Sequence, residues 1–429
     1  MATQGKHALI FGASGISGWS LMKQCVSYPI PSTFGRVTGL CNRPVDKKNL
    51  FLPDDPRLNI VSGVDLTGSV ETVVSDLQKK VPGVEDVDVV FFSGIVGPLS
   101  LSLSFPFFFF FFSAFIRCRP VRFTRLIRKT AYIQTNDHDS LLKVNTALLQ
   151  TAVQAITTAS KKVSTVVLQT GGKAYGVEWP DKIAIKPPFH EDVPRIPEPY
   201  RNKVFYYAQY DLLEKMSREP GCTWTFSEIR PDGIVGFAPG SNAMNMGQGI
   251  ALYLSIYREV FGKGAKVPFP GEKHGYHATH MDTFQDLLSR LEIYVGMNRD
   301  KCGNGSVFNA ADGQVVTWAT VWPGICEYFG LVGVEPEQEK VNDKESMERF
   351  VKGHMKEWQD LVEKHGLKKG SVESQNWGHT RFMLVDFDFH REFSMEKAKA
   401  VGFDETIDTV LGYKVAFDRM VEAKVIPRV

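Results

Sequence analysis

The chain has 429 residues, of which 43% are hydrophobic and 23% charged, an ordinary composition for a globular protein. Its formal net charge of +2 gives no reason to expect nucleic acid as a partner. Its cysteines are scattered without a CxxC pair, which is typical of buried thiols in a reducing compartment. A strand begins almost at Met1 and leaves no room for a signal peptide, so we expect a cytoplasmic protein that is not bound to a membrane.

The stretch HALIFGASGISGWSLMKQCV (7–26) predicts a buried strand, a glycine-rich turn and a helix. Glycines in this context allow a tight turn and a close approach to a pyrophosphate, and the helix N-terminus favours its charge. The stretch therefore predicts a dinucleotide site. The residues expected to bind the cofactor here are Gly12, Ser14, Gly15, Ile16 and Gly18.

The next two strands indicate which dinucleotide binds. The second strand, RVTGLCNRP, ends in Asn42 and Arg43 rather than in the acidic residue that would hold the ribose hydroxyls of NAD. An arginine suits a 2′-phosphate through charge-assisted hydrogen bonds, so we expect NADPH. The third strand, LNIVSGVDLTG, places Asp65 and Leu66 where the adenine edge would lie.

Strands and helices alternate through the first half of the chain, which predicts an α/β fold with a doubly wound parallel Rossmann sheet. We expect residues 1–235 to form an NADP-binding Rossmann domain. Residues 236–429 are expected to form a smaller, mainly helical substrate-binding region.

One segment, 94–130, does not fit this pattern, because it contains LSLSFPFFFFFF followed by several arginines. Phe, Ser, Leu and Pro are encoded largely by pyrimidine-rich codons, so the segment reads as a translated pyrimidine-rich tract. Removing residues 94–130 joins the predicted strand VVFFS directly to the loop AYIQTND. We interpret it as a translated intron. A genuine disordered or flap-like insertion and a membrane segment are the alternatives; Pro106 and several serines weaken the latter.

Two later stretches carry candidate catalytic residues. STVVLQTGGKAYG predicts a strand that ends just before Lys173, at the edge of a parallel sheet where ligands bind. NKVFYYAQYDLLE predicts a helix with the pair Tyr206 and Tyr207. The usual Tyr-x-x-x-Lys pattern of short-chain dehydrogenases is missing, because the helix has no lysine four residues after either tyrosine.

Together with GASGISG, these stretches and IRPDGIVGFAP resemble the progesterone 5β-reductase/iridoid synthase-like (PRISE-like) family of atypical extended short-chain dehydrogenases. The resemblance covers nearly the whole chain outside 94–130. It implies Lys173 and Tyr207 as catalytic residues, with Tyr206 as the alternative to Tyr207, because only one of two adjacent helical residues can reach the cofactor. It also implies Tyr132 as a substrate-facing aromatic.

We expect the backbone of Ile234 to bind the nicotinamide carboxamide. The resemblance implies NADPH-dependent reduction of a carbon–carbon double bond conjugated to a carbonyl, on a small hydrophobic substrate. A carbonyl reductase or epimerase-like enzyme and a non-catalytic NADPH-sensing protein are the alternatives.

The spacing of His274, His277 and His280 does not predict a metal site. The oligomeric state stays open, with a homodimer as one alternative.

Overall fold

The structure of the protein is a computed structural model. The described residues are 5–41, 44–93, 138–184, 186–240, 242–337 and 347–429. Three residues that were expected to touch a ligand, Asn42, Arg43 and Tyr132, lie outside the described part of the chain, as does the segment 94–130.

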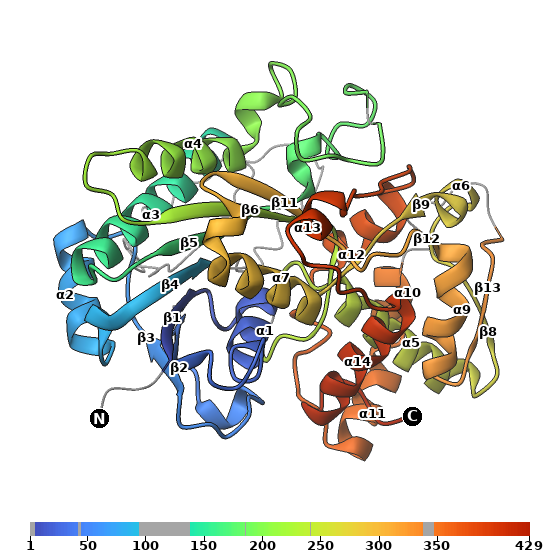
Figure 1. The fold of residues 1–429 in the computed structure, drawn as a ribbon. Helices are drawn as coiled ribbons and strands as arrows, with labels where there is room; N and C mark the ends of the chain where they lie inside the picture. Colours follow the sequence, from blue (N-terminus) through green and yellow to red (C-terminus); the bar gives the residue numbers. More distant parts are fainter. Residues whose placement is uncertain (1–4, 42–43, 94–137, 185, 241, 338–346) are drawn as a thin grey trace, which may run out of the picture.

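A parallel β-sheet forms the centre of the molecule (Figure 1). Its strand order is β11-β6-β5-β4-β1-β2-β3, and all neighbouring strands pair in parallel. The strands are β1 (Lys6–Phe11), β2 (Phe34–Cys41), β3 (Leu58–Ser62), β4 (Val87–Phe92), β5 (Thr165–Gln169), β6 (Thr225–Pro231) and β11 (Ser306–Ala310). The order reverses between β1 and β4, as in a doubly wound sheet. The predicted α/β fold class is confirmed.

Helices cover both faces of the sheet because side chains alternate along each strand. In β1, Ala8 and Ile10 belong to one buried cluster with Trp19, whereas Leu9 and Phe11 belong to another. Helices α1 (Ile16–Gln24) and α7 (Gln285–Met297) pack together on the first face, and α2 (Val70–Lys80), α3 (His138–Ala159) and α4 (Phe205–Ser217) on the second. Apolar runs such as HALIF are therefore buried on both sides.

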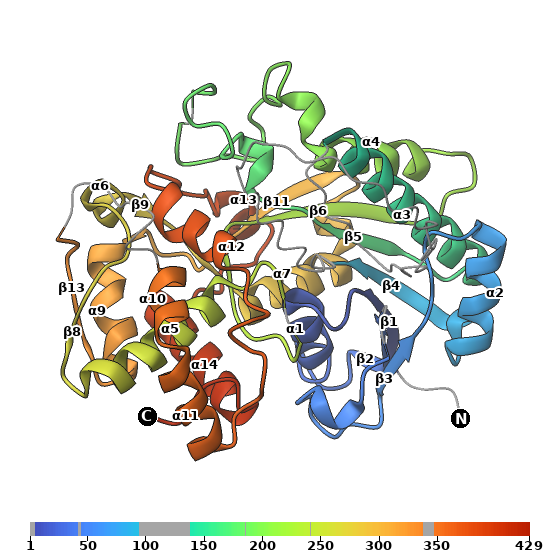
Figure 2. The same cartoon turned by 180° about the vertical axis from the view of Figure 1, so that it is seen from behind.

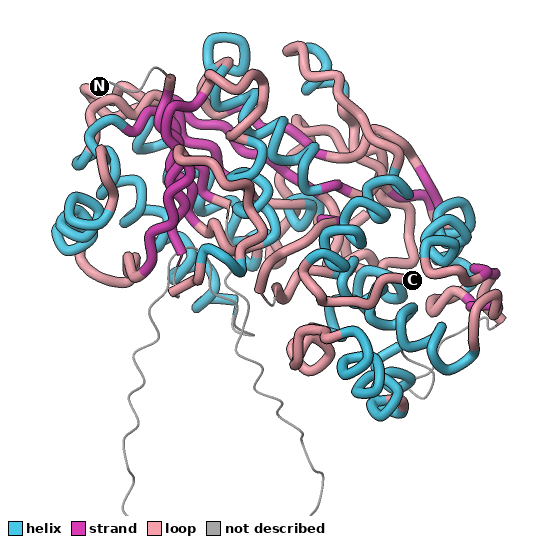
Figure 3. The backbone as a smooth tube through the Cα atoms, turned by 90° about the horizontal axis from the view of Figure 1, so that it is seen from below, coloured by secondary structure: helices cyan, strands magenta, loops and turns pink. Residues whose placement is uncertain are grey.

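A mainly helical region lies beside the sheet and contains the C-terminus (Figures 2 and 3). Its helices are α5 (Met246–Phe261), α6 (Lys273–His277), α9 (Trp318–Tyr328), α10 (Met347–Gly353), α11 (Met355–His365), α12 (Trp377–Arg381), α13 (Glu396–Ala400) and α14 (Thr409–Glu422). The short helix α8 (Arg299–Cys302) instead connects α7 to β11 beside the sheet. Short strand pairs join its loops: β7 (Ile234–Val235) with β10 (Thr283–Phe284), β8 (Lys266–Pro268) with β13 (Val332–Val334), and β9 (Thr279–His280) with β12 (Val316–Thr317). None of the described helices combines the length and apolar character that spanning a bilayer requires.

The chain returns to the sheet after entering the helical region. Helix α7 covers the first face, and β11 pairs with β6 as the last strand of the sheet. This pairing covers the edge that β6 would otherwise expose. The sheet layer thus contains residues from beyond 235. The division into two domains at that residue stays a prediction.

Candidate active site

A cavity of about 400 Å³ lies at the carboxyl ends of β4, β5 and β6. Open parallel sheets bind ligands at this edge, where the strand order reverses. The sheet side of the cavity consists of Ser93, 169–173 and 231–234, and the beginning of α1 contributes 15–17. The helical region forms the opposite wall with Asn242, Met244, Asn376, Gly378, His379, Phe382, Met383 and Phe387. The cavity therefore lies between the two layers of the protein.

Two glycines are required where β1 leads into α1, Gly12 by its backbone conformation and Gly18 by close packing. Gly12 has a φ of 87°, and its carbonyl accepts a hydrogen bond from the Gly15 amide at 2.9 Å. A Cβ atom on Gly18 would lie only 2.3 Å from the Gly12 carbonyl oxygen. Ser14 lies within this turn, and α1 begins at Ile16 beside the cavity. The turn and the helix N-terminus thus fit the pyrophosphate of a dinucleotide.

Two buried polar atoms at the strand ends also fit a polar ligand. Ser93 Oγ follows β4 and Gln169 Oε1 ends β5, and both residues line the cavity. Neither atom has a hydrogen-bond partner among the described residues. Because an unpaired buried polar atom costs about 1–3 kcal/mol, a ligand with complementary polar groups would stabilise this edge.

The expected adenosine contacts lie farther along the sheet. Asp65 follows β3, and its carboxylate accepts hydrogen bonds from the amide and the hydroxyl of Thr67 at 3.1 and 2.7 Å. Leu66 is 1% exposed and packs into the second core cluster. Neither residue is among those that line the cavity. Their role in binding adenine stays a prediction.

Lys173 lies in the cavity on a single helical turn, Gly172–Tyr175, that follows β5. Its Nζ forms an ion pair with Glu178 Oε1 at 2.7 Å, and the two side chains are 30% and 25% exposed. Burial and the positive charge of Lys173 lower the pKa of His379 to about 4. At neutral pH the cavity therefore contains a neutral imidazole beside the Lys173–Glu178 pair.

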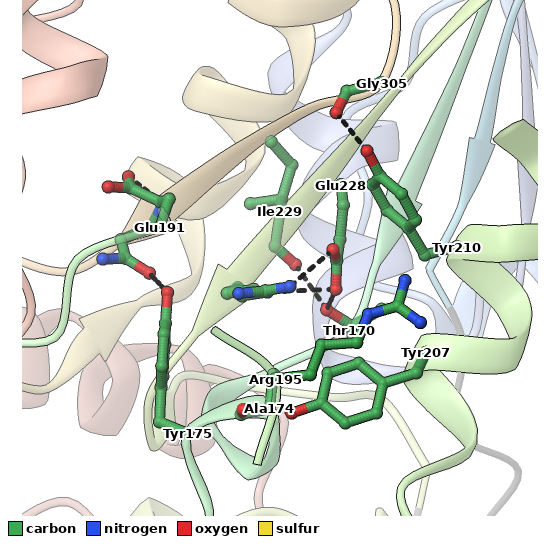
Figure 4. Close-up of polar contacts among 12 residues, drawn as sticks. Thr170, Ala174, Tyr175, Glu191, Arg195, Tyr207, Tyr210, Glu228, Ile229 and Gly305 are labelled. Carbon is green, nitrogen blue, oxygen red and sulfur yellow. Dashed lines mark hydrogen bonds and ion pairs between the residues drawn. The ribbon is translucent and has the colours of Figure 1, made fainter. Parts of the chain in front are cut away.

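The structure separates the two adjacent tyrosines of α4. Tyr206 lines the cavity, and its hydroxyl lies 3.6 Å from where a Cβ atom on Gly171 would be. Tyr207 is not among the lining residues; its hydroxyl donates to the Ala174 carbonyl at 2.6 Å (Figure 4). The same hydroxyl accepts a hydrogen bond from the Ile196 amide at 3.3 Å. Adjacent helical residues point about 100° apart, so only Tyr206 faces the cavity. The structure does not bring Tyr207 together with Lys173 in the cavity, in contrast to the assignment by motif.

Several cavity residues were missed by sequence reasoning. Asp232 lies between Pro231 and Ile234, and its Oδ2 accepts a hydrogen bond from Arg391 Nε at 2.9 Å. Burial raises the pKa of Asp232, and Arg391 opposes this shift. The apolar wall of Phe382, Met383 and Phe387 and the imidazole of His379 come from the distant helical region. Ser93, Gln169 and Asp232 could have been found, because each adjoins the carboxyl end of a predicted strand.

No three His, Cys, Asp or Glu side chains within the described ranges come together in a way that could hold a metal ion. His280 is buried against the ring of Trp318, with centroids 4.9 Å apart.

Comparison with known proteins decides the family. Residues 8–97 and 125–427 match the family model of the PRISE-like Rossmann-fold domain. The chain belongs to this family. The PRISE-like chain is 33% identical to the short chain dehydrogenase ausT of Aspergillus calidoustus over 98% of its own length and 94% of the relative. It is 25% identical to (S)-8-oxocitronellyl enol synthase ISY2 of Nepeta racemosa, over 92% and 85% of the two chains. The protein is an oxidoreductase of the short-chain dehydrogenase type.

Solved structures show the same fold at low sequence identity. Gre2 of Candida albicans, solved in complex with NADPH, superposes with a TM-score of 0.54 at 12% identity, covering 97% of this chain and 99% of that one. UDP-N-acetylglucosamine 4-epimerase of Methanobrevibacter ruminantium gives 0.55 at 11% identity, covering 98% and 99%. These structural neighbours include proteins with a nicotinamide cofactor in a Rossmann fold.

The PRISE-like family model leaves residues 98–124 unmatched, and these lie inside the segment 94–130. We propose that this segment is not part of the functional enzyme. A shortened chain without residues 94–130 should be more soluble than the full chain and at least as active, because a sequence run of apolar residues without charges promotes aggregation. Sedimentation and NADPH consumption of both chains test this. An inactive, unfolded shortened chain would show that the segment belongs to the structure.

Proposed function

We propose that the protein is an NADPH-dependent reductase of a carbon–carbon double bond conjugated to a carbonyl, acting on a small hydrophobic compound. One observation carries this proposal: the Tyr206 hydroxyl and the Lys173 amine share a cavity with the glycine turn and with an apolar wall. The turn fits a dinucleotide, the wall fits an apolar substrate, and the tyrosine supplies a hydrogen-bond donor between them.

The nicotinamide cofactor, when bound, supplies the hydride. Tyr206 is suited to donate a hydrogen bond to the substrate carbonyl oxygen, where negative charge develops as an enolate forms. Lys173 lines the same cavity as Tyr206; its positive charge, which the Glu178 carboxylate at 2.7 Å offsets in part, would favour the enolate electrostatically. Ile234 lines the cavity, and we propose that its backbone holds the carboxamide.

The wall opposite the sheet indicates the class of substrate. Phe382, Met383 and Phe387 give the cavity an apolar side, and Met244 extends it. Methionine and phenylalanine side chains pack against hydrocarbon without a fixed hydrogen-bonding pattern. A compact hydrophobic body with one conjugated carbonyl therefore matches this cavity.

We propose NADPH rather than NADH because Arg43 follows the second strand, and Gre2 of Candida albicans binds NADPH on the same fold. Arg43→Ala should raise the KM for NADPH about tenfold or more while leaving the KM for NADH nearly unchanged, since a charge-assisted hydrogen bond contributes about 1.5–3 kcal/mol. Steady-state kinetics with both cofactors measure this difference. An equal loss with both cofactors would show that Arg43 does not read the 2′-phosphate.

We also propose a cytoplasmic location. Cys25, Cys41, Cys302 and Cys326 are buried free thiols, which suits a reducing compartment.

The oligomeric state stays open, with a homodimer as an alternative to the monomer. Sedimentation of the purified protein decides between them.

Turnover with paired substrates tests the proposed reaction. NADPH consumption should be seen with cyclohexenone, whose double bond is conjugated to its carbonyl, and not with cyclohexanone, which lacks the double bond. Consumption with cyclohexanone would favour a carbonyl reductase. Binding of NADPH without consumption, across a broad panel of enones and ketones, would favour a non-catalytic NADPH-sensing protein.

A further inference from the structure

We propose that Arg391 is a positioning residue that fixes the apolar wall of the cavity, through Phe387, to Asp232 on the sheet side, and thereby limits the size of the substrate. The inference rests on the proposed function only in taking the apolar wall as the side of the cavity that receives the substrate. Arg391 is not itself among the residues that line the cavity, so its role is exerted through these two neighbours.

The first contact of Arg391 is with Asp232, which follows β6. Arg391 Nε donates a 2.9 Å hydrogen bond to Asp232 Oδ2, and the two side chains are 1% and 4% exposed. The Asp232 amide donates to Thr283 Oγ1 at 3.1 Å, and this hydroxyl donates to the carbonyl of Ala310 at 2.7 Å. Because Ala310 ends β11, Asp232 is a fixed anchor at the carboxyl ends of β6 and β11.

The same guanidinium contacts Phe387 on the opposite wall. Arg391 Nη1 donates a long hydrogen bond of 3.4 Å to the Phe387 carbonyl, and the guanidinium carbon lies 5.1 Å from the centroid of the Phe387 ring. Phe387 lines the cavity and is buried. A cation over an aromatic face is attracted by the ring, and the attraction is stronger where water is excluded. One side chain thus touches both walls of the cavity.

Phe387 also closes the turn that carries the rest of the apolar wall. Residues Phe382–Asp386 form a single π-helical turn, and the Phe387 amide donates to the Phe382 carbonyl at 3.0 Å. The ring centroids of Phe382 and Phe387 lie 4.2 Å apart. Isolated π-helical turns are rare and occur frequently at functional sites. A contact that fixes Phe387 therefore fixes the wall as a unit.

The backbone of Arg391 is held in place as well. Its amide donates to the carbonyl of Thr279, on β9, at 2.9 Å, and Arg391 forms a parallel bridge with His280. The cost of removing two charges from water offsets much of their attraction in a buried pair. We therefore assign to the Asp232–Arg391 pair a role in geometry rather than in stability.

Arg290 provides a matched control, because it also joins the C-terminal segment to the sheet layer. Arg290, on α7, pairs through Nη1 with Glu405 Oε2 at 2.9 Å, and the two side chains are 42% and 32% exposed. Neither residue is among those that line the cavity. Loss of this pair removes a link between the same two layers but does not touch the apolar wall.

The first experiment measures amide hydrogen exchange by mass spectrometry, without substrate. In Arg391→Met, residues 382–391 should exchange several times faster than in wild type, because the wall has lost its anchor. Arg290→Met should leave the exchange of this segment unchanged. Arg391→Lys retains a cation beside Asp232 and should restore part of the protection. The Kd for NADPH should be the same in all of these proteins.

The second experiment measures the size of the substrate that is accepted. The ratio of kcat/KM for 5,5-dimethylcyclohexenone to that for cyclohexenone should rise about tenfold in Arg391→Met, because a methyl group in a fitted apolar pocket changes discrimination by about this factor. Phe387→Ala, which enlarges the wall directly, should shift the ratio in the same direction. Arg290→Met should keep the wild-type ratio. A general loss of folded protein would lower both values and leave their ratio unchanged.

The double variant Asp232→Asn/Arg391→Met is a second arm in case Arg391→Met does not fold, because it leaves no unpaired carboxylate in the buried position. It should show the same faster exchange and the same shifted ratio. Wild-type exchange of 382–391 or an unchanged substrate ratio in the folded variants would overturn the positioning role. Hydrogen exchange does not require turnover, so wild-type protein that fails to reduce cyclohexenone would contradict the proposed function and leave the exchange test intact.

Discussion

Tyr206→Phe should lower the turnover of cyclohexenone about a hundredfold or more, because losing one donor to a developing oxyanion costs on the order of 3 kcal/mol. The substitution keeps the ring, which is 8% exposed and packs against Phe205, and removes only the hydroxyl that faces the cavity. The affinity for NADPH should change little. Stopped-flow turnover and fluorescence titration with NADPH measure the two effects separately.

Tyr207→Phe is the comparison for this prediction. Its hydroxyl is hydrogen-bonded to the Ala174 carbonyl and the Ile196 amide, so its loss should cost less turnover than the loss of the Tyr206 hydroxyl. A hundredfold loss in Tyr207→Phe with normal turnover in Tyr206→Phe would contradict the assignment made from the cavity. It would restore Tyr207, the residue assigned by motif, as the catalytic tyrosine.

Asp286→Ala should lower the apparent free energy of unfolding by about 3–5 kcal/mol, because it leaves a buried arginine without its partner. Asp286, on α7, accepts hydrogen bonds from Arg419 of α14 at 2.8 and 2.5 Å and from Ser20 of α1 at 2.9 Å. The two charged side chains are 10% and 12% exposed. These contacts join the helical region to the helix of the glycine turn, so the substitution should also weaken NADPH binding.

The pH dependence of this effect has a definite sign. Burial disfavours the charged carboxylate, but the hydrogen bonds and charge of Arg419 hold the pKa of Asp286 below its ordinary value of 3.8. The stabilisation is therefore fully present above that value and is lost as the pH falls through the lower folded-state pKa. Urea unfolding of wild type and Asp286→Ala should differ by a constant amount near neutral pH and converge in acid.

Asp360→Ala is a control for general effects of removing a carboxylate. Asp360 pairs with Lys356 at 2.8 Å on the surface of α11, where the two side chains are 56% and 82% exposed. Exposed pairs of this kind contribute at most about 0.5 kcal/mol. If Asp286→Ala were no more destabilising than Asp360→Ala, the buried pair would not hold the two layers together.

The sequence was sufficient for the parts of the site that follow directly from local structure. A strand, a glycine turn and a helix define the place of Gly12, Gly15 and Gly18, and a strand end defines the place of Lys173. These positions depend on only a few neighbouring residues: the glycines lie where β1 leads into α1, and Lys173 lies just after β5. Their roles in binding and catalysis stay predictions.

Other parts of the site depend on packing between distant segments. Which of Tyr206 and Tyr207 faces the cavity depends on how α4 is rotated about its axis against the sheet. Two adjacent aromatic residues in the sequence do not indicate that rotation. His379 and Phe382 reach the cavity only because α12 packs beside α5. The strand β11 was missed because its short apolar run follows a long helical stretch, although it pairs with β6 in the sheet.

The most direct test of the proposed reaction is the position to which the hydride is transferred. Wild-type protein is incubated with cyclohexenone and NADPH that carries deuterium at both positions of nicotinamide C4, and the product is analysed by NMR and mass spectrometry. The proposed reaction predicts cyclohexanone with one deuterium at the carbon β to the carbonyl. Cyclohexenol with deuterium on the carbinol carbon would contradict it.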